Sequence, residues 1–313
     1  MARLVAFLLL VAGIGCQPAR QSTSGTQATA PIIDMHFHGA LVFDEQEVQP
    51  ITPWLEAFDR RGVKKAVLSS YPHQLQVWAP KDPERLIPSL WFPCVTQFVR
   101  HCFPGDALLP EIKWLRGEIE SGRIAMIGEV GTQLVGIFPN DAVLDPYFSL
   151  AEELDIPFAL HMGPGPAWAV QGQSIYETFP DFQVRAGDPL ELQNVLQRHP
   201  RLRLYIMHAA WPMLDKLLTI LWHNPNVYVD LAHLQIAIPR AEYYSYLRRI
   251  ADAGYADRIM YGSDVGLDDF GSGIDAIMDA DFLSEKQKRD ILYNNAARFL
   301  RLSEETIAKH HGR

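Results

Sequence analysis

Two histidines separated by one residue, His36 and His38, follow an apolar run that begins at Ile32. Side chains two residues apart on a β-strand point to the same face, so Asp34, His36 and His38 would share one face, with both imidazoles at the C-terminal end. Two neutral imidazoles directed at one point suit a divalent transition metal. Because an HxH pair is a weak signal by itself, its meaning depends on how the other strands end.

Four further apolar runs end in a histidine or a carboxylate, with glycine or another small residue close behind. These residues are Glu129, His161, His208 and Asp264. A histidine at the end of a strand is more often a hydrogen-bonded core or rim residue than a metal ligand. Six polar groups placed by the same rule nevertheless favour one shared site.

The residue types suit metal-assisted chemistry. Histidine ligands hold Zn²⁺ and leave a position open for water, whose pKa the metal lowers toward neutrality. Asp264 is the candidate for both metal ligand and general base, because a carboxylate close to that water can take its proton. Glu129 could bridge a second metal or could orient a ligand, and Asp34 is expected to orient an imidazole.

Eight short apolar runs alternate with helix-like segments between residues 31 and 302. Continuous apolar strands are buried on both faces, which is typical of a parallel sheet. The pattern predicts a single-domain (β/α)8 TIM barrel, in which catalytic side chains lie at the C-terminal ends of the strands. An open doubly wound sheet is the alternative, but the glycine-rich phosphate loop that it would need is missing from the sequence. Helices are expected over residues 53–61, 110–121, 145–154, 189–197, 213–222, 241–253 and 285–300.

Several of these motifs together resemble the amidohydrolase superfamily, in its amidohydrolase-2 branch. The resemblance covers residues 31–302 and rests on DMHFH at 34–38, GEVG at 128–131, the isolated His161 and His208, YGSD at 261–264 and NNAARF at 294–299. It implies a TIM barrel with one or two divalent metal ions, with Zn²⁺ favoured. It also implies that His36, His38, His161 and Asp264 are metal ligands.

The same resemblance leaves His208 as either a ligand of a second metal or an acid that faces the substrate. Many binuclear members carry a carboxylated lysine on strand 4, where this chain has Glu129, as in TatD-like and phosphotriesterase-like proteins. This difference favours hydrolysis of an amide, lactone, ester or phosphoester of a small molecule. Decarboxylation of an aromatic or unsaturated acid is the alternative, and a non-catalytic binding protein that retains the barrel is a third.

The segment over residues 163–187 is long for a βα loop and should lie over the active-site face of the barrel. Its aromatic residues Trp168 and Tyr176 could bind an apolar or cyclic part of a substrate, and Arg185 could bind a carboxylate or phosphate oxygen. Alternatively, the aromatic side chains pack the loop onto the barrel rim. Rim packing is also the expected role of Tyr71, His73, Trp91 and His233.

The N-terminus has the pattern of an export signal of the bacterial lipoprotein type over residues 1–16, with Cys16 as the candidate lipid-bearing residue. Residues 17–30 would form a flexible tether and residues 303–313 a C-terminal tail. These features predict an exported protein that is either periplasmic or anchored to a membrane.

Composition and cysteine content add two further expectations. The net charge of −9 argues against a nucleic-acid partner, and the sequence does not indicate an oligomeric state. Cys94 and Cys102 could form a disulfide in an exported protein or could be unrelated thiols, because pairing cannot be read from sequence.

Overall fold

The computed structural model describes residues 30–39, 48–95, 102–165, 174–264 and 266–313. The predicted signal segment with Cys16, the tether and Trp168 lie outside these residues. Eight parallel strands form one sheet in which spatial order follows chain order. The strands are β1 (Ile32–Phe37), β2 (Val63–Ser70), β3 (Leu86–Phe92), β4 (Met126–Val130), β5 (Phe158–His161), β6 (Leu204–Met207), β7 (Val227–Asp230) and β8 (Ile259–Met260).

The sheet closes through backbone hydrogen bonds between β1 and the segment directly after β8. The Met35 N–H donates to the Tyr261 carbonyl at 2.9 Å, and the Asp264 N–H donates to the His36 carbonyl at 2.8 Å. These bonds bring the end of the chain's last strand against the HxH segment. The predicted TIM barrel is therefore confirmed.

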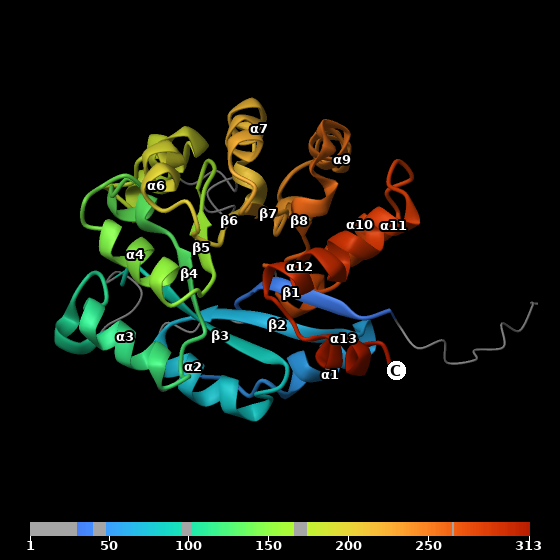
Figure 1. Ribbon diagram of the computed structural model, residues 1–313, viewed down its shortest axis with the longest axis horizontal. Helices are drawn as coiled ribbons and strands as arrows, with labels where there is room; N and C mark the ends of the chain where they lie inside the picture. Colours follow the sequence, from blue (N-terminus) through green and yellow to red (C-terminus); the bar gives the residue numbers. More distant parts are fainter. Residues whose placement is uncertain (1–29, 40–47, 96–101, 166–173, 265) are drawn as a thin grey trace, which may run out of the picture.

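Helices surround the strands, as Figure 1 shows. They are α1 (Thr52–Arg61), α2 (Pro72–Trp78), α3 (Ile112–Glu120), α4 (Asp145–Glu153), α5 (Ile175–Thr178), α6 (Gln193–Arg198), α7 (Leu214–His223), α8 (Leu234–Ala237), α9 (Arg240–Ile250), α10 (Ser272–Met278), α11 (Glu285–Arg289), α12 (Asn295–Phe299) and α13 (Glu304–His310). Of the described helices, none has the combination of length and apolar character required to cross a bilayer.

A capping motif in the sequence explains where α11 begins. Ser284 forms a capping box with Gln287 at the start of α11, which continues through the π-turn η12 (Asp290–Asn294) into α12. The expected 285–300 helix is thus present as three joined pieces. Helix α2 has no recognisable period in the sequence because its seven residues span only about two turns.

The C-terminal segment is a packed helix, although the sequence suggested only a tail. Ser303 caps α13 by accepting a hydrogen bond from the Thr306 N–H. Ile307 packs against the cluster of side chains that fills the barrel, and the Tyr293 hydroxyl lies 2.7 Å from Nδ1 of His310. This helix therefore covers part of the end of the barrel that α12 also closes.

The core has two layers because the strands are buried on both faces. The larger layer lies between the strands and the helices, where Phe37 packs on Trp54 and Phe58 of α1. The inner cluster joins side chains from strands all round the sheet with those of α12, and Tyr205 within it donates its hydroxyl to the Met35 carbonyl at 2.7 Å. A satisfied hydroxyl makes this buried tyrosine compatible with an apolar interior.

Cys94 and Cys102 form a disulfide, so the structure decides between the two alternatives that the sequence left open. Both side chains are buried within the outer core layer. The bridge joins the segment after β3 to the segment before α3.

Replacing both Cys94 and Cys102 by alanine should lower the free energy of unfolding by about 2–3 kcal/mol, because a bridge across a short loop restricts the unfolded chain. Urea denaturation of the oxidised protein and of the double variant measures the difference. Adding a reductant should destabilise the wild-type protein and leave the variant unchanged. Equal stability of both proteins under oxidising conditions would contradict the prediction.

Candidate metal centre

The six residues predicted to form the metal site meet at the C-terminal ends of the strands. His36 lies in β1 and His38 directly after it, Glu129 lies in β4, and His161 ends β5. His208 follows β6 directly, and Asp264 lies in the segment after β8. The prediction that residues spread over the chain converge at one end of the barrel is borne out by their distances.

The first half of the cluster is formed by His36, His38 and Asp264. Nε2 of His36 lies 3.0 Å from Nε2 of His38. Oδ1 of Asp264 lies 3.8 Å and 3.6 Å from these two nitrogen atoms. The three side chains form a group of potential ligand atoms that all lie within 4.8 Å of one another.

Glu129 connects this first half to a second pair of histidines. Its Oε2 lies 2.9 Å from Nε2 of His38 and 3.5 Å from Nε2 of His36. Its Oε1 contacts Nδ1 of His161 and lies 3.7 Å from Nε2 of His208. One carboxylate therefore faces two sets of imidazoles, with one oxygen directed at each set.

Hydrogen bonds to protein acceptors fix the tautomers of three imidazoles. Nδ1 of His38 donates to the Ser69 carbonyl at 2.7 Å, and Nδ1 of His208 donates to the Ala232 carbonyl at 2.9 Å. Nδ1 of His36 donates to Oδ2 of Asp230 at 3.1 Å. In a neutral imidazole the other nitrogen then carries a lone pair, so each Nε2 is available as a metal ligand.

The donor set fits a divalent cation. The Nε2 lone pairs of His36 and His38 face each other at 3.0 Å, and an oxygen of Glu129 faces the same point, so these groups repel one another unless positive charge lies between them. Nε2 of His161 is buried without a hydrogen-bond partner. Imidazole and carboxylate ligands together suit Zn²⁺ and neighbouring transition metals.

Electrostatic interactions within the cluster favour charged groups despite burial. Burial alone would raise the pKa of Glu129, but His161, His208 and His36 outweigh it and hold this pKa well below its usual value. Burial alone would also raise the pKa of Asp264, which His36, His38 and His208 instead lower. Both carboxylates are therefore negatively charged at neutral pH and attract a cation.

Burial and the neighbouring carboxylates also shift the pKa values of the histidines. Burial disfavours a charged imidazole, but the carboxylates of Asp264 and Asp230 outweigh this effect and raise the pKa of His36 well above its usual value. For His161 burial prevails and lowers the pKa. The two imidazoles therefore differ in the direction of their pKa shifts.

Two glycines of the sequence motifs permit the strands to approach closely. A Cβ atom on Gly262 would lie 2.6 Å from Cβ of His36, and one on Gly128 would lie 2.3 Å from Cβ of Ala159. Both distances are shorter than any that real side chains adopt. Glycine is needed at these positions because β8 packs against β1, and β4 against β5, where the ligands lie.

Asp34 does not orient an imidazole ring, contrary to expectation. Its Oδ1 accepts the backbone N–H groups of His36 at 3.0 Å and Ser263 at 2.9 Å. The strand register is irregular between Asp34 and Phe37, so simple alternation does not extend along the whole strand. The ring of His36 is held by Asp230 instead.

Asp230 is the functional residue that sequence reasoning missed. The apolar character of residues 227–232 predicts one strand that contains Asp230, whereas β7 ends at this residue. The available signal was its carboxylate after the apolar run VYV, the pattern that identified the other strand ends.

Two of the predicted substrate residues lie on the surface. Tyr176 in α5 is 54% exposed, and its ring centroid lies 6.2 Å from that of Phe182. The guanidinium of Arg185 donates to Glu191 at 3.2 Å and lies 5.6 Å from the ring centroid of Phe138. These contacts do not join either residue to the ligand cluster.

The rim contains aromatic side chains closer to the ligands. Trp91 lies beside His38, with ring centroids 5.5 Å apart, and stacks on Tyr71 at 4.8 Å. Nδ1 of His233 donates to the Asp264 carbonyl at 2.7 Å. Trp91 and His233 therefore each lie beside a residue of the cluster.

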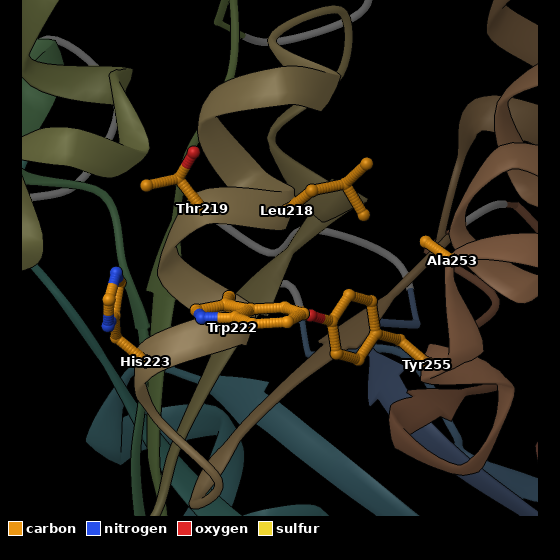
Figure 2. A pocket seen from close by; sticks show the side chains of 6 residues that line it. All are labelled: Leu218, Thr219, Trp222, His223, Ala253 and Tyr255. Atoms are coloured by element: carbon orange, nitrogen blue, oxygen red, sulfur yellow. The ribbon is translucent and has the colours of Figure 1, made fainter.

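A separate hollow lies in the outer layer of helices (Figure 2). Its lining comes from α7 and the segment after α9, and includes Trp222, which is 78% exposed. None of the predicted site residues lines it, so it is distinct from the metal centre.

Comparison with known proteins identifies the family. A family model described as Amidohydrolase (Amidohydro_2) matches residues 104–302, which include four of the six cluster residues. The chain belongs to the amidohydrolase family. The HxH pair precedes the matched segment, so its inclusion in the site rests on the geometry described above. A search of curated proteins found no match.

Solved structures of other proteins share the fold. They include a 2,6-dihydroxybenzoate decarboxylase from Rhizobium, with 16% identity, a TM-score of 0.56 and coverage of 88% of this chain and 99% of that one. A protein described as a probable 2-pyrone-4,6-dicarboxylic acid hydrolase from Acinetobacter baumannii has 15% identity, a TM-score of 0.60 and coverage of 87% and 99%. A dihydroxybenzoic acid decarboxylase from Polaromonas sp. JS666 with bound manganese has 15% identity, a TM-score of 0.53 and coverage of 89% and 99%. At these identities the likeness extends to the fold alone.

His36→Ala should abolish stoichiometric metal binding, because His36 belongs to both groups of potential ligands, the one with His38 and Asp264 and a second with Glu129 and His208. Elemental analysis of purified protein after loading with Zn²⁺ and dialysis measures the metal content. His223→Ala, which removes an exposed imidazole of α7 in the separate hollow, is the matched control and should bind metal as the wild type does. Unchanged metal content in His36→Ala would contradict the assignment.

Proposed function

We propose that this amidohydrolase is a metal-dependent hydrolase that acts on an amide, lactone, ester or phosphoester of a small molecule. The arrangement of Glu129 carries the proposal. Its two carboxylate oxygens face the His36–His38 pair and the His161–His208 pair separately. Such a set of ligands suits two adjacent cations, an arrangement used by hydrolytic enzymes.

The residues that would hold metal are His36, His38, Glu129, His161, His208 and Asp264, and the proposed metal is Zn²⁺, as one or two ions. When bound, a divalent cation lowers the pKa of a bound water and polarises a carbonyl or phosphoryl oxygen. The four imidazoles favour Zn²⁺ over a hard cation such as Mg²⁺. Manganese, reported in a neighbour of similar fold, is the alternative.

Asp264 is suited to accept a proton from the attacking water. Oδ1 faces His36 and His38, while Oδ2 lies 3.9 Å from Nδ1 of His208 and 3.8 Å from Nδ1 of His233. Its side chain is 23% exposed, more than the other five side chains of the cluster, so water can reach it. Because neighbouring imidazoles lower the pKa of Asp264, the carboxylate is ionised and ready to accept a proton.

His208 would either hold a second metal or, where it does not, stabilise negative charge that develops on the substrate. Burial opposes the charged form, but the interaction with Glu129 and the charges of Asp264 and Asp230 raise the pKa of His208 above its usual value. The centroid of its ring lies 5.0 Å from that of His36 and 4.7 Å from that of His161. This position allows it to interact with a group bound at the centre.

Substrate binding is proposed for the segment over residues 163–187, through Trp168, Tyr176 and Arg185. The Gly163 N–H donates to the Gly187 carbonyl at 3.0 Å, so the two ends of this segment are joined directly after the strand that carries His161. A segment held at its base in this way can lie over the C-terminal face of the barrel. The surface contacts of Arg185 and Tyr176 would then have to rearrange when substrate binds.

We also propose that the protein is exported, and is either periplasmic or attached to a membrane through a lipid on Cys16. The Cys94–Cys102 disulfide supports export, because structural disulfides persist mainly in oxidising compartments.

Hydrolysis and decarboxylation differ in whether water enters the product. A reaction in ¹⁸O-labelled water should place one labelled oxygen in the product, as mass spectrometry would detect, and release no carbon dioxide. In the same assay Asp264→Asn should lower kcat by about 10²–10⁴-fold, the range for loss of a general base. Release of carbon dioxide without incorporation of label would instead establish the decarboxylase.

Glu129→Gln should lower the metal content from two ions per chain to one or none, because the amide keeps the shape of the side chain but loses its charge and one oxygen ligand. Elemental analysis together with titration of the metal-free protein gives the ratio. A wild-type ratio of one that Glu129→Gln leaves unchanged would contradict the role given to Glu129.

A further inference from the structure

We propose that Asp230 is a positioning residue shared by both halves of the metal centre. Its carboxylate sets the tautomer of His36 and holds the backbone of His208, so that both imidazoles present Nε2 to the metal. This inference rests on the proposed metal centre and assigns a role to a residue that is not itself a ligand.

The contacts of Asp230 divide between two elements of the site. The residue ends β7 and is fully buried. Oδ2 lies 3.1 Å from Nδ1 of His36. Oδ1 accepts the backbone N–H groups of His208 at 2.8 Å and Ala232 at 3.0 Å. One side chain thus connects the ends of β1, β6 and β7.

The contact with His36 determines where the imidazole proton lies. An ionised carboxylate can only accept, so Nδ1 of His36 must donate and Nε2 is left with its lone pair. His38 and His208 obtain the same tautomer from backbone carbonyls, those of Ser69 and Ala232. Of these three imidazoles, His36 alone depends on a side chain, which a substitution can alter.

The contact with His208 supports an unfavourable backbone conformation. His208, Ala209 and Ala210 have φ values of 55°, 44° and 49°, a region that residues with a Cβ atom rarely adopt. Such a turn persists only where surrounding contacts hold it. Asp230 binds its first N–H, and the Tyr246 hydroxyl donates to the Ala209 carbonyl at 2.9 Å.

Asp230 also holds the acceptor of the His208 ring. The Ala232 N–H is bound by Oδ1 of Asp230, and the Ala232 carbonyl accepts the Nδ1 proton of His208. The backbone and the ring of His208 are therefore both fixed relative to the same carboxylate. Loss of the Asp230 charge should affect both halves of the centre.

The test is Asp230→Asn. The amide oxygen can still accept the two backbone N–H groups, which leaves the NH₂ group facing Nδ1 of His36. This group must donate, so the proton of His36 moves to Nε2 and blocks coordination. The affinity of metal-free protein for Zn²⁺, measured by competition with a chromophoric chelator, should fall about 10- to 100-fold, the range seen when partners of metal ligands are removed.

Asp34→Asn is the matched control. Asp34 is also fully buried and also accepts two backbone N–H groups, from His36 and Ser263, but no hydrogen bond joins it to an imidazole. Its Zn²⁺ affinity should stay within about threefold of the wild type, well short of the loss expected when a metal ligand's partner is removed. Equal losses in the two variants would show a general structural effect and overturn the proposal, as would wild-type affinity in Asp230→Asn.

The tautomer itself provides a readout that does not depend on bound metal. In ¹⁵N-histidine-labelled, metal-free wild-type protein at a pH high enough for His36 to be neutral, long-range ¹H–¹⁵N spectra should place its proton on Nδ1, and in Asp230→Asn on Nε2. If the variant does not fold, the wild-type spectrum alone still decides, since a proton on Nε2 would overturn the proposal. A wild-type protein with this Nδ1 tautomer but no affinity for metal would instead refute the proposed function.

Discussion

Closure of the barrel between β8 and β1 is the constraint on which the site depends. The Met35 N–H donates to the Tyr261 carbonyl directly after β8, and the Asp264 N–H donates to the carbonyl of His36 itself. A proposed metal ligand from the end of the barrel is thereby tied to one from its beginning. Gly262 makes this approach possible, because a Cβ atom there would collide with His36. The hydrogen bonds that close the barrel consequently also bring Asp264 to His36.

The closed barrel then brings together groups that would not stay close in isolation. Glu129 and Asp264 are buried beside four imidazoles, and the field of each group shifts the pKa of the others. Burial of charge is unfavourable without partners, and here every carboxylate oxygen of Glu129 faces an imidazole nitrogen. The same arrangement that satisfies the carboxylates creates a point where lone pairs converge. The fold therefore supplies a preorganised site for a cation.

The sequence was sufficient for the barrel and for the residues of the cluster, because both follow from strong local patterns. Continuous apolar runs mark buried strands, and a polar residue at the end of such a run is conspicuous. The positions of His36, Glu129 and Asp264 needed no knowledge of tertiary contacts beyond the rule that strand ends share one face of a barrel. Family membership, shown by the match over residues 104–302, agrees with the motifs.

Features that depend on exact register or on long-range contacts were not predictable. Asp230 was missed because strand boundaries are uncertain by a few residues, and a shift of two residues hides a strand end. The role predicted for Asp34 was wrong because the irregular register of β1 interrupts the alternation of side chains along the strand. Helix α13 appeared as a tail because its packing partners, including Tyr293, come from another helical segment.

Anomalous diffraction from a crystal loaded with Zn²⁺ would show whether the six side chains converge on metal. We expect peaks at the zinc edge within coordination distance of Nε2 of His36 and His38 and beside Glu129, His161 and His208. Peaks confined to other parts of the molecule, with these six side chains free of metal, would contradict this expectation.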